Sequence, residues 1–297
     1  MKLRHHHAVL LMVLVAFLWS TAGVATRHLE YARTFEVTFW RSLFALISLL
    51  VILPLFQGRA VFGKLRDAGG ALWVSGACWA TMFTGYMVSL TLTTVGNVLV
   101  ILSVGPLLTA IAARILIGYR VPRRTWLAIV VAGAGMAYMF ASQVGSASLV
   151  GSLVALAIPI AAAINWTISQ HAHDQGHDLD LVPAVLLGAL LSTLATCFLA
   201  YPFNASVHDV TLLGLLGLFQ LAIPCVLCMV CARVLHAPEI SLLQLLEVIF
   251  GILLAWLGAN EEPGTPVLLG GSLVIGALVA NEWFGWNKDR NLAKTAT

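Results

Sequence analysis

Residues 210–234 read VTLLGLLGLFQLAIPCVLCMVCARV, and their one charged side chain is Arg233, next to the end of the stretch. A helix needs about 20 predominantly apolar residues to cross the hydrocarbon core of a bilayer, which is about 30 Å thick. No water is available in that core, so a spanning segment has to satisfy its own backbone hydrogen bonds, and an α-helix does so. The stretch therefore predicts a transmembrane helix.

The same character recurs along the rest of the chain. Hydrophobic residues make up 60% of the 297 residues and charged residues only 10%, whereas a soluble domain is typically about a quarter charged. So few charges cannot cover a surface that faces water. The sequence predicts an all-α integral membrane protein without a soluble domain. About ten transmembrane helices are expected, near residues 7–26, 35–56, 69–91, 95–117, 124–142, 148–169, 182–202, 210–234, 238–258 and 264–286.

Lysine and arginine residues indicate how these helices are oriented, because cytoplasmic connections carry an excess of both. With the N-terminus inside, the outer connections hold only Arg27 and Arg33, and Arg41 lies within a span. All other Lys and Arg residues fall on the inner side, and an even number of spans places the C-terminus there too. We therefore expect an integral protein of a bacterial inner (plasma) membrane with cytoplasmic N- and C-termini.

The chain repeats itself weakly at an offset of 142 residues, which aligns Gly105-Pro106 with Glu247-Val248. A similar offset of 147 aligns Trp19-Ser20 with Trp166-Thr167. The repeat predicts two five-helix halves, residues 1–144 and 145–297. Because five is odd, the second half enters the membrane with the opposite polarity. Such an inverted-topology repeat is a common design of secondary transporters.

Short apolar motifs follow one another in a familiar order. They read FLWS at 17–20, FWRSLFA at 39–45, SVGPLLTA at 103–110, FQLAIP at 219–224, SLLQLLE at 241–247 and ANE at 259–261. Together they make the chain similar to the ten-helix EamA-type members of the drug/metabolite transporter superfamily. The chain departs from that pattern at Tyr119, where the first repeat of the family usually has Glu, and at Val248, where the family has Pro.

The resemblance implies two EamA-like five-helix repeats and the export of metabolites, commonly amino acids or related compounds, around a central cavity. It implies that spans one to four and six to nine form the site, while the fifth and tenth brace the bundle. The two halves would rock around this site in alternating access. The resemblance does not fix the substrate.

Two charged residues lie within predicted spans. Glu247 is near the middle of the ninth span, where a charge is costly and faces a cavity or a partner by default. A buried carboxyl is a candidate for proton exchange, and the alternative is a structural carboxyl that fixes helix packing. Arg41 lies in the second span, where its guanidinium suits a substrate carboxylate. The alternative is an Arg that snorkels or pairs with Glu36.

Aromatic residues form a second set of candidates. Trp19 and Trp166 hold related places in the two repeats, and we weigh a cavity wall or gate against an interfacial position, where Trp is enriched. Trp79 and Tyr86 are seven residues apart and share a helix face. With Trp40 they are candidates to line an aromatic pocket, and packing against neighbouring helices is the alternative.

Amide side chains within spans need hydrogen-bond partners in hydrocarbon, so they either join helices or contact the substrate. The three candidates are Asn165, Gln220 and Gln244. Proline within an apolar run frees a backbone carbonyl and kinks a helix. Helices broken at such residues suit a midplane site, and tolerated kinks are the alternative. The prolines concerned are Pro106, Pro159 and Pro224.

We interpret the potential metal ligands in the sequence as structural or solvent-exposed residues. Cys225, Cys228 and Cys231 lie in a hydrophobic helix, and their spacing does not converge on one metal, so we interpret them as packing residues. The histidine-containing loop 171–178 is interpreted as a solvated linker, with metal sensing as the alternative. The triplet at residues 5–7 is given no function. We therefore predict no cofactor and no metal site.

The sequence contains no phosphate-binding loop and none of the common hydrolase or metalloprotease motifs. We therefore predict that the protein is not an enzyme but a secondary transporter, most simply an exporter of amino acids or related metabolites. The alternatives are a proton-coupled exporter of cationic drugs and, from other classes, a membrane enzyme or a channel. The expected partners are a small-molecule substrate and the lipid bilayer, with no nucleic acid, and the chain is expected to be a monomer or a homodimer.

Overall fold

The computed structural model of the protein describes residues 3–32, 34–58, 61–63, 69–93, 95–141, 149–174, 180–259 and 264–295. Every regular element in these ranges is helical. The first half contains α1 (His5–Ala25), α2 (Thr34–Gln57), α4 (Gly70–Leu92), α5 (Val95–Leu102), α6 (Gly105–Leu116) and α7 (Arg123–Phe140). The second half contains α8 (Leu149–Asp174), α9 (Pro183–Cys197), α10 (Val207–Leu216), a π-helical segment (Gly217–Ala222), α11 (Ile223–Cys231), α12 (Ala237–Gln244), α13 (Leu246–Ala259) and α14 (Thr265–Thr295).

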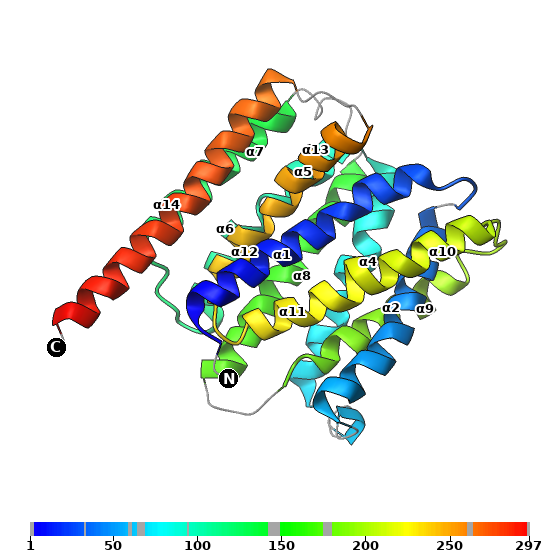
Figure 1. The fold of residues 1–297 in the computed structure, drawn as a ribbon, viewed down its shortest axis with the longest axis horizontal. Coiled ribbons are helices and arrows are strands. Elements are labelled where there is room, and N and C mark those ends of the chain that lie inside the picture. The colour runs from blue at the N-terminus through cyan, green and yellow to red at the C-terminus, as the bar shows by residue number, and fades with distance from the viewer. Residues whose placement is uncertain are drawn as a thin grey trace.

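Helices lie at all ten segments that the sequence predicts as spans. Within the described ranges, seven segments are long and apolar enough to cross a membrane, judged by length and composition. That α4, α7 and the shorter α9 also cross it stays a prediction. The two chain ends point toward the same side of the bundle (Figure 1). The seven segments are His5–Ala22, Phe35–Gln57, Asn97–Leu116, Leu149–Asp174, Val207–Cys231, Ala237–Leu254 and Thr265–Gly285.

The outer surface of the bundle is apolar. Large hydrophobic side chains such as Phe56, Ile115, Phe198 and Leu257 are more than half exposed. Exposed apolar patches of this extent mark a surface that contacts something other than water. Since the helices are also of spanning length, the surface suits the hydrocarbon of a bilayer.

Three segments that the sequence predicts as single spans are divided in the structure. The segment 95–117 breaks between α5 and α6, and Pro106 lies in the first turn of α6. The segment 210–234 passes through the π-helical turn, and Pro224 lies in the first turn of α11. Proline is tolerated there because the first amide groups of a helix have no partner within that helix.

The third division has no proline at the break. The segment 238–258 divides between α12 and α13 at Leu245. Pro159, by contrast, lies inside the continuous helix α8. Of the two alternatives weighed for these prolines, Pro159 follows the tolerated proline within a helix.

The divisions follow the internal repeat. Both α5 and α12 are eight residues long, and their first residues, Val95 and Ala237, are related by the 142-residue offset. The first residues of α7 and α14, Arg123 and Thr265, are related in the same way. The weak sequence repeat therefore corresponds to matching helix boundaries in the two halves.

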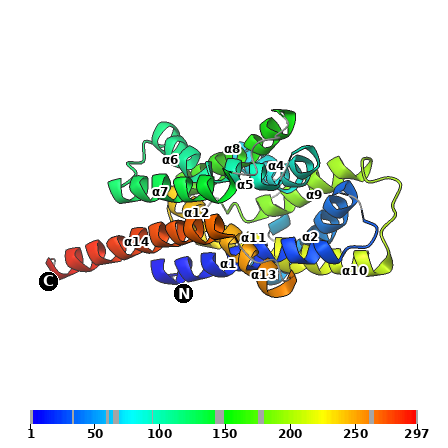
Figure 2. The same ribbon diagram turned by 90° about the horizontal axis from the view of Figure 1, so that it is seen from above.

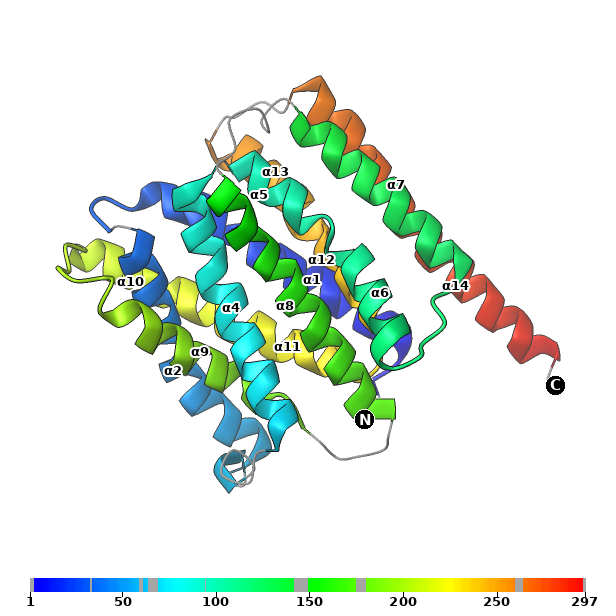
Figure 3. The ribbon, with the colours of Figure 1, turned by 180° about the vertical axis from the view of Figure 1, so that it is seen from behind.

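The helices form two layers. Figure 2 shows α4 to α9 in one layer and α1, α10, α11, α13 and α14 in the other. Each layer therefore contains helices from both halves. The pair α7 and α14 lies along one edge, as seen from behind in Figure 3. These are the fifth and tenth predicted spans.

Glycine allows the close approach of α7 and α14. A Cβ atom added at Gly135 would lie 2.7 Å from the carbonyl oxygen of Gly270. One added at Gly270 would clash with the Met139 side chain and with the carbonyl oxygen of Gly135 on α7. Gly270→Val is therefore expected to destabilise the protein by about 1–3 kcal/mol, which is typical of overpacking. The apparent melting temperature in detergent measures the effect.

Gly276 provides the matched control in the same helix, because nothing lies within 4 Å of a Cβ atom added there. Gly276→Val should leave the melting temperature close to that of the wild type. Equal losses for the two variants would contradict the close approach at Gly270.

Two buried carboxylates hold the connections at the end of the bundle opposite the chain termini. Asp209, in the first turn of α10, accepts hydrogen bonds from the backbone amides of Glu30, Tyr31 and Ala32 at 2.8–3.0 Å. It also accepts one from the amide of Ser206 at 3.3 Å. The connection between α1 and α2 is thereby fixed to the second half of the chain.

Glu36, in the first turn of α2, binds the connection between α9 and α10 in the second half of the chain. Its carboxylate accepts hydrogen bonds from the backbone amides of Asn204 at 3.0 Å and Ala205 at 2.7 Å. Trp40 Nε1 donates to it at 3.4 Å. We call Glu36 and Asp209, with the amides that they bind, the carboxylate clasp.

Asp209→Asn is expected to weaken the carboxylate clasp, because the amide offers one acceptor oxygen in place of two. Each buried amide left without a partner costs about 1–3 kcal/mol. We expect the apparent melting temperature to fall by several degrees. Asp174→Asn, at an exposed position at the end of α8, should cause no such fall, and equal behaviour of the two variants would refute the clasp.

Candidate functional site

Three polar side chains from α2, α4 and α13 approach one another inside the bundle. Arg41 is 3% exposed, while Tyr86 and Glu247 are partly buried. The three groups interact electrostatically. In the described part of the chain, no direct ion pair joins Arg41 to Glu247. Arg41 and Glu247 therefore carry opposite charges that interact electrostatically without a direct ion pair.

The Arg41 guanidinium is poorly satisfied where it lies. One of its terminal nitrogens donates to the carbonyl oxygen of Phe83 at 3.5 Å, which is a long contact, and its Nε has no partner among the residues that the structure describes. Burial excludes snorkelling, and Glu36 binds the carboxylate-clasp amides instead of Arg41. Arg41 is thus buried within the bundle and forms no ion pair with Glu36 in the described part of the chain. A buried cation of this kind needs further acceptors.

Two of the amide side chains predicted to join helices or contact substrate also have one atom without a hydrogen-bond partner in the described part of the chain. Asn165 is fully buried, and its Oδ1 accepts from Ser75 at 2.6 Å while its Nδ2 has no partner in the described ranges. Gln220 lies in the π-helical turn and donates to the carbonyl oxygen of Trp19 at 3.4 Å, and no described residue bonds to its Oε1. Single π-helical turns within α-helices occur frequently at functional sites. Unpaired buried atoms on residues predicted to contact substrate are candidates for ligand contacts.

The predicted tryptophans in the middle of the bundle pack together. The rings of Trp79 and Trp166 meet edge to face with centroids 5.5 Å apart, and Trp79 lies at the same distance from Phe83. Trp166 is fully buried and donates from Nε1 to Gln244 at 3.0 Å, while the Nε1 of Trp79 has no partner among the described residues. Trp19 is 7% exposed. Trp19 and Trp166 are therefore both buried inside the bundle.

Trp40 lies apart from these rings. It packs against Phe39, Phe44 and Phe203, and its Nε1 donates to the carboxylate clasp. Trp40 and Tyr86 both pack against a small hydrophobic cluster formed by Val37, Met87, Leu213 and Leu216. The aromatic pocket expected from Trp40, Trp79 and Tyr86 is thus divided between two clusters, with Trp79 in the larger one.

A chain of hydroxyl groups beside Arg41 was not predicted. Ser192 on α9 is 2.9 Å from both Ser42 on α2 and Thr84 on α4. These contacts join α9 to α2 and α4, the two helices that carry Arg41 and Tyr86. Serine and threonine are common in membrane helices, and only the position of Ser42 next to Arg41 could have indicated its role.

Apolar helices of spanning length around buried, opposite charges define an integral membrane protein with an internal polar site. The model of the EamA-like transporter family matches residues 6–141 and again residues 149–281. The chain therefore belongs to the EamA-like transporter family, and it is a membrane transporter of the drug/metabolite type.

A solved structure supports the fold. A crystal structure with 16% sequence identity superposes with a TM-score of 0.72 and covers 94% of this chain and 96% of its own. At that identity the likeness concerns the fold alone. A search of curated proteins finds no match.

Proposed function

We propose that the protein is a secondary transporter that exports amino acids or closely related zwitterions. The observation that supports the proposal is the electrostatic interaction between Arg41 and Glu247, which form no direct ion pair in the described part of the chain. A guanidinium binds a carboxylate with two parallel hydrogen bonds. A carboxylate binds an ammonium group in turn. An α-amino acid carries both partner groups and would neutralise both buried charges at once.

The surrounding side chains suit the remainder of such a substrate. The Phe83 backbone and the Tyr86 side chain, both on α4, interact with Arg41, and Trp79 packs against Phe83 on the same helix. The unpaired Nδ2 of Asn165 and Oε1 of Gln220 offer a donor and an acceptor. We therefore propose that the site prefers amino acids with apolar or aromatic side chains.

We propose alternating access as the mechanism, with residues 1–144 and 145–297 as inverted five-helix halves. The family model matches the chain twice, and the breaks at α5/α6 and α12/α13 are related by the repeat. Broken helices beside a midplane site are a feature of such transporters. Cytoplasmic termini in a bacterial inner membrane complete the proposal, supported by the distribution of Lys and Arg.

The two ends of the bundle differ in how the halves meet. The largest hydrophobic cluster begins near the chain termini with Ala8 and Met12 and includes Cys228, Cys231 and Ile240 of the second half. The opposite end is held by the polar carboxylate clasp and a smaller cluster. We propose that these two contact regions open in turn.

Export of cationic drugs is the second candidate. Glu247 is partly accessible and interacts with Tyr86. A carboxylate beside an aromatic ring attracts an organic cation by charge and by cation–π contact. Proton exchange at Glu247 would couple such export to the proton gradient.

Counterflow in proteoliposomes tests the proposal. Vesicles preloaded with an unlabelled amino acid should accumulate labelled tracer when they contain the protein, and protein-free vesicles should not. Exchange with amino acids of apolar side chain establishes the function. Exchange with organic cations and with no amino acid would establish the second candidate instead.

A further inference from the structure

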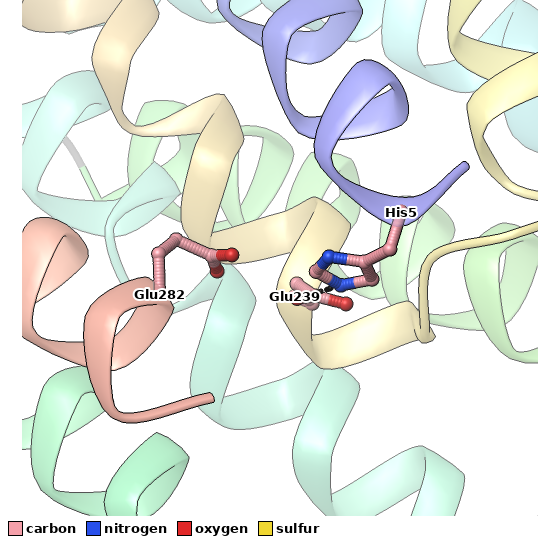
Figure 4. Close-up of side chains that lie close together, drawn as sticks. All are labelled: His5, Glu239 and Glu282. Carbon is pink, nitrogen blue, oxygen red and sulfur yellow. Dashed lines mark hydrogen bonds and ion pairs between the residues drawn. The ribbon is translucent and has the colours of Figure 1, made fainter. Parts of the chain in front are cut away.

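A histidine and two glutamates meet at the end of the bundle that carries the chain termini (Figure 4). His5 begins α1, Glu239 lies in the first turn of α12, and Glu282 lies on α14. His5 Nε2 is 2.8 Å from Glu239 Oε1. One ligand atom from each residue lies within 4.8 Å of those of the other two. Figure 4 shows the Glu282 carboxylate directed toward the His5–Glu239 pair.

The two carboxylates are shielded from solvent. The Glu239 side chain is 12% exposed, against 51% for His5, and Glu282 is partly buried. Like charges at this separation repel one another more strongly as solvent is excluded. In the described part of the chain, the His5 imidazole pairs directly with Glu239, and His236 also interacts with Glu239 electrostatically. The cluster therefore carries an excess of negative charge that a bound cation would neutralise.

The surroundings hold the cluster in place. Asn281 Nδ2 donates to Glu282 Oε1 at 3.2 Å, and Asn281 Oδ1 accepts from Thr125 at 3.1 Å. Glu239 and Asn281 also line a small cavity of about 30 Å³, which is about the volume of one water molecule in the liquid. Arg124 lines the same cavity, but its guanidinium packs against Gly285.

We propose that His5, Glu239 and Glu282 bind a divalent transition-metal cation, with Zn²⁺ the best match. Zn²⁺ takes imidazole nitrogen and carboxylate oxygen at about 2.0–2.2 Å in tetrahedral geometry, which places neighbouring ligand atoms roughly 3.4 Å apart. The one printed separation, from His5 Nε2 to Glu239 Oε1, is 2.8 Å, and all three ligand atoms lie within 4.8 Å of one another, so small side-chain shifts reach that value. Ca²⁺ and Mg²⁺ prefer oxygen ligands throughout. The adjacent cavity has room for the water that would complete the coordination.

Such a cation would act on the transport cycle. His5 belongs to the first half of the chain, whereas Glu239 and Glu282 belong to the second. A bound cation therefore ties the two halves together at the end that carries the termini. It stabilises the conformation in which that end is packed, so binding should slow exchange without any contact with the substrate.

Zinc binding by the purified full-length protein tests the site directly. After treatment with a chelator, the protein is titrated with ZnCl₂ against a chromophoric zinc indicator in detergent. The wild type should bind one ion that Glu282→Gln and His5→Asn each weaken by more than tenfold. Even the loss of a hydrogen-bond partner of a metal ligand costs about 10- to 100-fold in affinity. X-ray absorption of the bound zinc should show nitrogen and oxygen ligands without sulfur.

Matched controls separate this site from other histidines. His7→Asn changes an exposed neighbour within the same triplet, and His173→Asn changes an exposed position at the end of α8. Both should bind zinc as the wild type does. Zn²⁺ should also raise the melting temperature of the wild type but not of Glu282→Gln, whose melting temperature without metal shows that it folds.

Three results would overturn the proposal: no saturable binding, binding that survives Glu282→Gln, or binding that His7→Asn removes. Each of them leaves the amino-acid counterflow of the metal-free protein unaffected. Failure of the zinc site is therefore distinguishable from failure of the proposed transport function.

Discussion

Replacing Arg41 with glutamine is expected to abolish most amino-acid exchange. The substrate carboxylate loses its bidentate partner, and the partly buried Glu247 loses the opposite charge with which it interacts. Removing one member of a buried, hydrogen-bonded charge pair costs about 2–5 kcal/mol, which corresponds to a loss of affinity of roughly 30-fold or more. The measurement is the apparent affinity for the amino acid in proteoliposome counterflow.

Two companion variants sharpen this prediction. Arg41→Lys keeps the positive charge but loses the planar, two-pronged donor, so it should retain only part of the affinity. Arg120→Gln removes a positive charge at an exposed position in the connection between α6 and α7, and it should behave as the wild type. Full activity of Arg41→Gln in a folded protein would exclude Arg41 from substrate recognition.

Glu247→Gln is expected to have the second large effect. The amide keeps the shape of the side chain but cannot neutralise the ammonium group of the substrate. Hydrogen bonds to charged groups contribute about 1.5–3 kcal/mol, so the apparent affinity should fall by about 10- to 100-fold. Counterflow kinetics of the variant, at equal protein incorporation, measure the change.

The control for Glu247→Gln is Glu30→Gln. Glu30 is exposed on the connection between α1 and α2, and its backbone amide, not its side chain, binds Asp209. This variant should transport normally. If Glu247→Gln also transports normally, Glu247 is a structural carboxyl, which is the alternative that the sequence left open.

The helices were predictable because the length and apolarity of a span are local properties. The break before Pro106 and the irregular turn before Pro224 were indicated by proline, whose missing N–H and ring disturb a helix. The break at Leu245 has no such signal, since Val248 stands where the family has Pro. The repeat correspondence with the α5/α6 break could have identified it.

The candidate site was predictable in residue type and not in arrangement. A charge within an apolar run identifies Arg41 and Glu247, but one sequence does not fix the rotation of each helix. For that reason Trp40 was grouped with Trp79, although it packs near the carboxylate clasp instead. The cluster of His5, Glu239 and Glu282 was missed because its members lie far apart in sequence on three helices.

Competition by head-group analogues tests the central claim most directly, because the account places a zwitterion between Arg41 and Glu247. Three compounds with one side chain are compared as inhibitors of wild-type counterflow: the amino acid, the amine that lacks its carboxylate, and the acid that lacks its ammonium group. The account predicts strong inhibition by the amino acid and at least about tenfold weaker inhibition by each of the other two. Equal inhibition by the amine would contradict the account and favour an exporter of organic cations.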